Sequence, residues 1–232
     1  MSRRARPVSL VLSLVSVFAA LNVIGDFVPL TPIIGFEQSR LTLGWAFASL
    51  TGLMLGPLFG GLSCLLASLA ELFLGFPLLI PFGPLGLVRS ALAAFQTGLF
   101  STRRWAFSGG ILLLLIIGWL LTPQGKEAML VLAFHVLGLV LILASRSRVA
   151  NALESHSRRQ IGLAVAIACY CGNISRHLFG NLLFVLLASL PAVVFLTAMP
   201  LTFVEQTFFA LLSGVLGASL VLLGLRQVTY LG

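Results

Sequence analysis

Apolar runs long enough to cross a lipid bilayer recur along the whole chain, and they limit its fold more than any other feature. A transmembrane helix needs about 20 mostly apolar residues, and no polar stretch between these runs is long enough to form a soluble domain. Only 9% of the residues are charged, against about 25% in an average soluble domain. We therefore predict one integral membrane domain over residues 1–232, folded as an all-α polytopic helix bundle.

Eight apolar segments are expected, and the second and third are short enough to form a hairpin with one end buried in protein. Six to eight helices would then cross the membrane. The first segment resembles a signal peptide but lacks a convincing cleavage site, so we interpret it as a retained helix. The segments are 8–29, 44–58, 60–79, 85–101, 106–122, 127–145, 160–190 and 203–226.

The net charge of +8 comes mainly from short basic loops. Eight crossings place ten basic residues on one side of the membrane and only Arg40 and Lys126 on the other. Because basic residues collect on the cytoplasmic side, this pattern predicts that both termini are cytoplasmic, and it explains the charge better than nucleic-acid binding does. The ten are Arg3, Arg4, Arg6, Arg103, Arg104, Arg146, Arg148, Arg158, Arg159 and Arg226.

The strongest candidate for a binding surface is the segment GNISRHLFGN. Asn173, His177 and Asn181 are spaced four apart and would share one face of a helix, with Arg176 beside them. An Arg can hold a carboxylate or phosphate through paired hydrogen bonds. The alternative is an internal Arg–Glu pair with the Asn side chains bonded between helices.

Two further charges, Glu71 and Arg89, lie inside apolar runs, where a charge is costly and commonly functional. They could neutralise each other, or Glu71 could neutralise Arg176, or either could face a ligand. Asn22 and Asp26 share a face near the outer end of the first helix. The 31–43 loop is either a lid over an outward-facing pocket or an ordinary exposed loop.

Other polar and aromatic residues have simpler interpretations. We expect His135 to be a hydrogen bonder between helices, and Glu205 to begin the last helix, where an acid is favoured. Trp45, Trp105 and Trp119 fit an aromatic belt at the membrane surface. A kink or break is expected near Gly172. The cysteines and histidines form no metal motif, and no nucleotide-binding loop is present, so no metal ion or other cofactor is expected.

The chain resembles the S components of energy-coupling factor (ECF) transporters, which are small membrane proteins that bind vitamins or related micronutrients. The resemblance rests on an Arg-rich start, the outer loop Thr31–Leu43, a glycine pattern leading to Glu71, and the segments FGPLGLVRSALAAFQTGLFSTRR and GNISRHLFGN. The glycine pattern comprises Gly52, Gly56, Pro57, Gly60 and Gly61. Family members typically have six helices, so 106–145 would be an inserted hairpin.

The resemblance implies a transport subunit of a prokaryotic cell membrane, not an enzyme. It would capture a small substrate outside and dock on a transmembrane coupling protein with two ATPases to release the substrate inside. The docking face would be Ser9, Ser13, Ser16 and Ala20 of the first helix. The ligand would be held by Asn22, Glu71, Arg89, Asn173, Arg176, His177 and Asn181.

The arginines and His177 favour an anionic ligand, and the few aromatic residues expected at the pocket disfavour a large flat ring. Three other functions remain open. The pair His177 and Asn181 resembles the last motif of the CPBP intramembrane proteases, although the chain lacks the Glu-Glu pair of that family. The chain could also be a stand-alone secondary transporter, or a structural membrane protein in which the buried charges only pair with each other.

Overall fold

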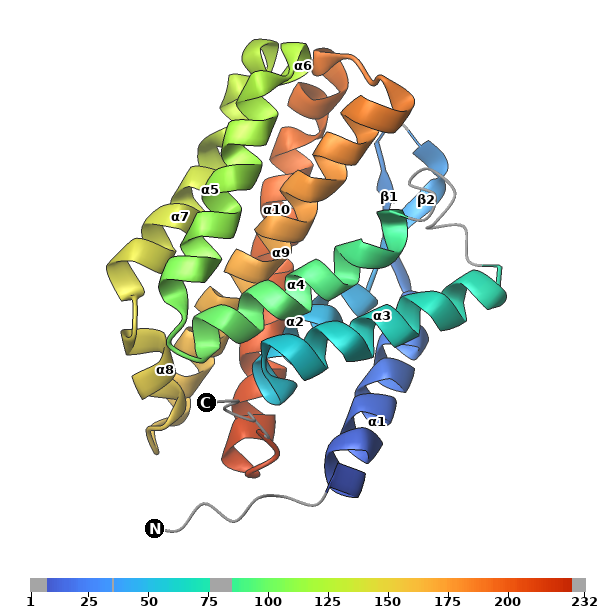
Figure 1. The fold of residues 1–232 in the computed structure, drawn as a ribbon. Coiled ribbons are helices and arrows are strands. Elements are labelled where there is room, and N and C mark those ends of the chain that lie inside the picture. Colours follow the sequence, from blue (N-terminus) through green and yellow to red (C-terminus); the bar gives the residue numbers. More distant parts are fainter. Residues whose placement is uncertain (1–7, 35, 76–84, 227–232) are drawn as a thin grey trace.

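A computed structural model describes residues 8–34, 36–75 and 85–226 and consists almost entirely of helices (Figure 1). This confirms the predicted all-α bundle, with the addition of one small β-hairpin. The helices are α1 (Val8–Asp26), α2 (Gly44–Leu55), α3 (Pro57–Phe73), α4 (Gly86–Ser101), α5 (Trp105–Leu121), α6 (Pro123–Glu127), the 3₁₀ helix η3 (Met129–Leu132), α7 (Ala133–Ser145), α8 (Arg148–Leu153), α9 (Arg158–Ala188) and α10 (Ala192–Leu222).

Within the described residues, three helices are long and apolar enough to cross a membrane: α1 from Ser9 to Asp26, α9 and α10. Large apolar side chains also cover the outside of the bundle, among them Leu114, Leu186 and Val215, each at least 65% exposed. Extensive exposed apolar surface is rare on a soluble monomer. Helix length and surface composition together indicate a membrane protein.

Helix α9 forms the centre of the bundle, packing against α2, α4, α5, α7, α8 and α10. Its N-terminus is capped by Ser157, whose hydroxyl accepts a hydrogen bond from the Gln160 amide. In Figure 1, α3 and α4 cross the direction of α5, α7 and α10, and α5 and α7 run side by side as a helical hairpin. Polar residues on α9 are therefore surrounded by other helices and removed from lipid.

Helices α2 and α3 form the tight hairpin that the glycine pattern predicts. Gly56 joins them with φ 81°, a left-handed conformation that favours glycine, and Pro57 begins α3, where its missing N–H costs nothing. Gly52 lies directly against the α4 backbone, where a Cβ atom would collide with the carbonyl of Ala94. These residues let three helix backbones approach closely.

The 31–43 loop contributes to an antiparallel β-hairpin of β1 (Pro29–Ile33) and β2 (Phe36–Thr42). Its register is irregular between Pro29 and Thr31 and again between Pro32 and Ile33. Proline cannot donate a ladder hydrogen bond, which explains why the irregularities lie beside the two prolines. Tyr, Phe and β-branched residues favour strands, and Thr31, Ile33 and Phe36 supply that tendency here.

Several predicted boundaries are wrong. The last helix begins at Ala192, eleven residues before the predicted start at 203, and continues through Pro200. Helix α9 is continuous from Arg158 to Ala188, so it has no break at Gly172. That glycine instead provides space for α4, since a Cβ atom there would come within 2.7 Å of the Ala93 carbonyl oxygen. Segment 127–145 is divided among α6, η3 and α7.

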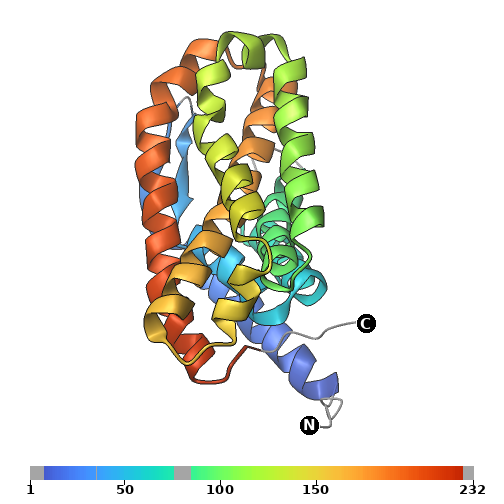
Figure 2. The ribbon, with the colours of Figure 1, turned by 90° about the vertical axis from the view of Figure 1, so that its left-hand side faces the viewer.

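Basic connections gather at one end of the bundle. The start of α1, helix α8 and the end of α10 lie at this end in two perpendicular views, and α6 lies at the other (Figures 1 and 2). Arg103 forms a 3.0 Å ion pair with Glu154, and Arg226 donates a 2.7 Å hydrogen bond to the Ser101 carbonyl. These contacts connect the α4–α5 turn to α8 and to the end of α10. The arginines at positions 3, 4 and 6 lie outside the described residues.

Candidate functional site

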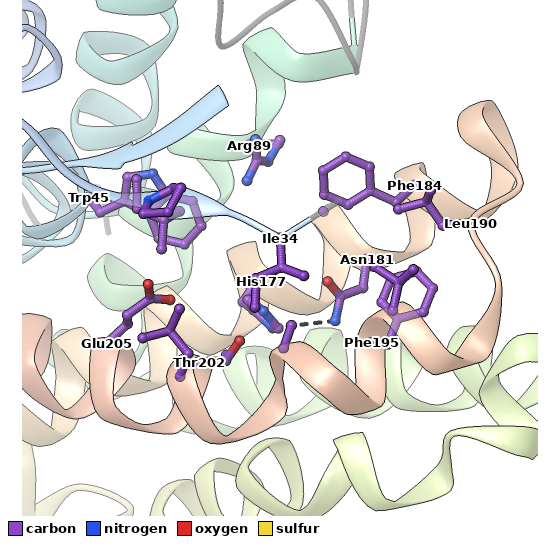
Figure 3. Close-up of a pocket in the computed structure, with 16 residues that line it drawn as sticks. Ile34, Trp45, Arg89, His177, Asn181, Phe184, Leu190, Phe195, Thr202 and Glu205 are labelled. Atoms are coloured by element: carbon purple, nitrogen blue, oxygen red, sulfur yellow. Dashed lines mark hydrogen bonds between the residues drawn. The ribbon is translucent and has the colours of Figure 1, made fainter. Parts of the chain in front are cut away.

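A cavity of ≈ 70 Å³ lies beneath the β-hairpin, between α9 and α10 (Figure 3). One water molecule needs about 10–15 Å³ of such space, so the cavity has room for several waters or a small molecule. Its walls combine charged, polar, aromatic and aliphatic side chains. They are Pro32, Ile34, Leu41, Trp45, Arg89, His177, Gly180, Asn181, Phe184, Leu190, Val194, Phe195, Ala198, Leu201, Thr202 and Glu205.

The β-hairpin covers this cavity and is attached to two helices. Pro32, Ile34 and Leu41 supply its lining side chains. Thr31 donates a hydrogen bond to the Glu205 carboxylate of α10, and Thr42 donates one to Asp26 of α1. Glu205 is therefore a buried cavity residue in the middle of α10, and the expectation that it begins the last helix is wrong.

Trp45 forms an aromatic wall that faces two arginines. The guanidinium carbon of Arg176 lies 4.0 Å from the centre of the Trp45 ring and that of Arg89 lies 5.3 Å away. Phe209 stacks on the same indole at 6.0 Å. A cation over an indole face gains about 0.5–2 kcal/mol, the most when both are removed from water. Trp45 is only 1% exposed, so it is not part of an aromatic belt.

Arg176 is buried with incomplete hydrogen bonding. Its Nε and Nη1 atoms have no hydrogen-bond partner among the residues that the structure describes. Asp26 and Glu71 lie close enough to act on it electrostatically. Asp26 is the main acidic group that acts on Arg176, and it also acts on Arg89. Glu71 makes a smaller contribution at Arg176.

A pair of histidines joins α7 to the cavity. His135 Nε2 lies 3.2 Å from His177 Nδ1, and His135 Nδ1 lies 2.9 Å from the Val131 carbonyl oxygen. Asn181 Nδ2 lies 3.5 Å from His177 Nδ1. His135 is fully buried, whereas His177 borders the cavity. The pair extends the polar wall of the cavity to α7.

The seven predicted ligand residues divide into two groups. Arg89, His177 and Asn181 line the cavity. The other four are buried within the bundle and do not line the cavity: Asn22, Glu71, Asn173 and Arg176.

The two asparagines among those four form hydrogen bonds within the bundle. Asn22 donates hydrogen bonds to the Phe18 carbonyl and to Thr51 Oγ1. Asn173 accepts one from Ser49 at 2.7 Å. Both amides therefore link helices.

Sequence reasoning missed Trp45 and Glu205 as cavity residues and His135 as the partner of His177. Trp119 is also fully buried, and three aromatic side chains, from Trp45, Phe184 and Phe195, line the cavity. The expectation that few aromatic residues reach the pocket is thus wrong. The available signal was the position of Trp45 just after the 31–43 loop, for which a lid was one of the two interpretations.

The predicted docking residues lie on one exposed face of α1. Ser9, Ser13, Ser16 and Ala20 are all exposed, and the hydroxyls of Ser13 and Ser16 bond back to carbonyls of their own helix at 2.9 and 3.1 Å. These polar groups are therefore satisfied within α1, which leaves a smooth face of small residues.

Comparison with known proteins yields limited information. An uncharacterized protein of Methanocaldococcus jannaschii is 28% identical over 181 residues, which is 78% of this chain. The chain spans 59% of the length of that relative. No family model matches the chain, and no solved structure matches it.

Proposed function

We propose that this chain is the membrane-embedded substrate-binding subunit of an ECF-type importer in a prokaryotic cytoplasmic membrane. It would capture a small, vitamin-like micronutrient outside and release it inside after docking on an ATPase-driven coupling module. The observation that carries the proposal is the cavity beneath the hairpin, where Arg89, His177 and Glu205 face a common space. Three polar groups from three separate helices are more than helix packing requires.

The position of the cavity supports uptake from outside. Under the proposed topology of six to eight crossings with both termini cytoplasmic, the arginine-rich end faces the cytoplasm. The hairpin emerges from the C-terminal end of α1, and the hydrogen bond from Thr31 to Glu205 holds it to α10 beside the cavity. Opening this hairpin would admit a substrate from the outer side.

The volume and the lining of the cavity limit the size and the chemistry of the substrate. Its ≈ 70 Å³ is well below the roughly 300–1,000 Å³ of drug-sized ligand sites, so a ligand larger than a few heavy atoms requires the hairpin to move. Arg89 can donate to an anionic group, and the aromatic walls favour a partly apolar molecule.

The docking step gives the proposal its direct test. The full chain is purified with a tag from membranes of its own source, and an ATPase and a membrane coupling protein are sought in the complex. Ser13→Phe places a bulky ring on the exposed face of α1 and should abolish co-purification. Thr197→Phe, an equally exposed hydroxyl position on α10, should retain it.

Other outcomes assign other functions. Uptake into liposomes by the chain alone, driven by an ion gradient, would make it a secondary transporter. A peptidase activity lost in Glu71→Gln would favour the intramembrane protease. A chain with neither ligand nor ATPase partner would leave only a structural role.

A further inference from the structure

His135 and His177 meet in the interior of the bundle with a defined pattern of donors and acceptors. His135 Nδ1 faces the Val131 carbonyl oxygen at 2.9 Å. A carbonyl oxygen only accepts hydrogen bonds, so His135 carries its proton on Nδ1. In a neutral ring the other nitrogen, Nε2, is then an acceptor, and it is the atom that contacts His177.

The proton on His177 follows from this contact. His135 Nε2 and His177 Nδ1 are 3.2 Å apart, and one of the two must donate. Because His135 Nε2 accepts, His177 Nδ1 donates and therefore carries the proton. The Asn181 NH₂ group and the His177 Nδ1–H are both donors and cannot bond to each other. The orientation of an amide is assigned from its hydrogen-bond network, so the Asn181 oxygen, rather than its nitrogen, faces His177 Nδ1.

The opposite arrangement requires a charged His135. If His135 Nε2 also carried a proton, the ring would be a cation with no exposed surface. Neither histidine has a carboxylate within 4.0 Å among the described residues, where the ion pair that forms is Arg103–Glu154 at the α4–α5 turn. An isolated buried charge costs far more than a neutral hydrogen bond.

We propose that His135 is a positioning residue that fixes His177 in its Nδ1–H tautomer, so that His177 offers an unprotonated Nε2 to the cavity and the ligand donates an N–H or O–H to it. His177 Nε2 has no hydrogen-bond partner within the described part of the chain, and its residue borders the cavity. The ligand-binding half of this inference rests on the proposed function.

The neighbouring side chains narrow the ligand further. The Glu205 carboxylate is a second acceptor in the cavity, with one oxygen already bonded to Thr31. Arg89 only donates. The cavity therefore suits a small molecule that combines N–H or O–H donors with an acceptor or anionic group. A ligand that only accepts hydrogen bonds would leave His177 Nε2 buried and unpaired.

Nitrogen-15 NMR of the full chain, labelled at histidine and held in detergent micelles, tests the tautomer directly. The chain has three histidines, and His156 is exposed and serves as the reference. We expect His135 and His177 each to show a protonated Nδ1 and a bare Nε2. His135→Gln, which keeps an acceptor oxygen, should preserve the His177 tautomer. His135→Met, which removes the acceptor, should shift His177 toward Nε2–H. A protonated Nε2 on wild-type His177, or a tautomer unchanged in His135→Met, would overturn the proposal.

Diethyl pyrocarbonate, which reacts with unprotonated imidazole nitrogens, tests whether His177 Nε2 faces accessible space. His156 and His177 should be modified, whereas His135, with both nitrogens bonded, should not. A reactive His135 beside an inert His177 would contradict the orientation. The two proposals fail separately. If no ATPase complex is found, the importer proposal fails while the NMR result stands. If His177 has the other tautomer, the positioning role of His135 fails even in a functional importer.

Discussion

At the residue scale, the buried arginines are accommodated by an aromatic ring as well as by carboxylates. Trp45 lies 4.0 Å from the Arg176 guanidinium, and Asp26 and Glu71 act on that arginine from further away. A guanidinium is weakly hydrated for a cation and stacks on aromatic faces. The indole therefore stabilises a charge that hydrogen bonds from the described residues satisfy only in part.

Trp45→Leu should lower the free energy of unfolding by about 2–3 kcal/mol, less than the roughly 3–5 kcal/mol of truncation to alanine, because leucine refills part of the space. Trp105→Leu is the matched control, because Trp105 also lies under an arginine, Arg146 at 5.2 Å, but is only partly buried. We expect a loss of about 1 kcal/mol or less there. Denaturant-induced unfolding in micelles measures both, and equal losses would contradict the role of Trp45.

Contacts between site residues that are close in the sequence could be predicted, whereas contacts between residues far apart in the sequence could not. His177 and Asn181 are four residues apart on one helix, so their shared face could be predicted. Thr31 and Glu205 are 174 residues apart, and nothing in either local sequence indicates that bond. His135 was correctly expected to bond between helices, but its partner could not be identified without the packing of α7 on α9.

At the scale of elements, the hairpin over the cavity is held mainly at its ends. Thr31 bonds to α10 and Thr42 bonds to α1, and two irregular positions interrupt the ladder between the strands. An isolated two-stranded hairpin is marginally stable. The hairpin can therefore open as a unit when its bond to α10 is broken.

Thr31→Val should accelerate amide hydrogen exchange in residues 29–42, because it removes the donor to Glu205 and keeps the shape of the side chain. Thr197→Val removes a hydroxyl that bonds only within α10 and should leave the hairpin unchanged. Hydrogen exchange followed by mass spectrometry compares the two variants. Equal protection of residues 29–42 in both would show that this bond does not hold the hairpin.

The close packing of α2 against α4 at Gly52 predicts that a larger residue there destabilises the fold. Gly52→Ala should destabilise the fold by about 1–3 kcal/mol, the usual cost of overpacking, because its Cβ atom would meet the Ala94 backbone. Gly110→Ala is the control, since a Cβ atom there has nothing within 4 Å, and alanine is favoured in a helix. The midpoint of thermal unfolding should therefore fall in Gly52→Ala and rise in Gly110→Ala. An unchanged midpoint in Gly52→Ala would be inconsistent with the close packing of α2 on α4.

Helix positions were predicted well and some helix ends poorly. Apolar length and glycine turns placed α1 to α5 within a few residues of their observed bounds, except that α3 ends at Phe73 rather than at 79. The predicted start of the last helix at 203 is too late, and the observed helix includes Pro200, a residue that usually disrupts a helix interior. In the structure α10 continues through it, packed along α9. The hairpin was expected only as a loop, because its prolines obscure the strand pattern.

At the scale of the whole molecule, the two ends of the bundle differ in charge. The arginines beside α8 lie at one end and Lys126 in α6 at the other (Figure 1). This polarity predicts which end faces the cytoplasm, and that direction determines whether the cavity opens outward.

Cysteine labelling in intact cells tests this orientation. Glu127→Cys in α6 should react with a membrane-impermeant maleimide from outside. Asn151→Cys in α8 should react only after the cells are permeabilised. Both positions are exposed, and the three native cysteines are at most 1% exposed, so they give little background. The reverse labelling pattern would place the cavity on the cytoplasmic side and contradict an importer.

Native mass spectrometry of the chain extracted gently from its own host tests most directly whether the cavity binds a small molecule. We predict one small molecule bound to the wild-type protein and to His156→Leu, where an exposed histidine is removed. We predict none on His177→Leu, whose unfolding must first be shown to be unchanged. A wild-type protein without any bound molecule, or a molecule retained equally by His177→Leu, would contradict the assignment of this cavity as the substrate site.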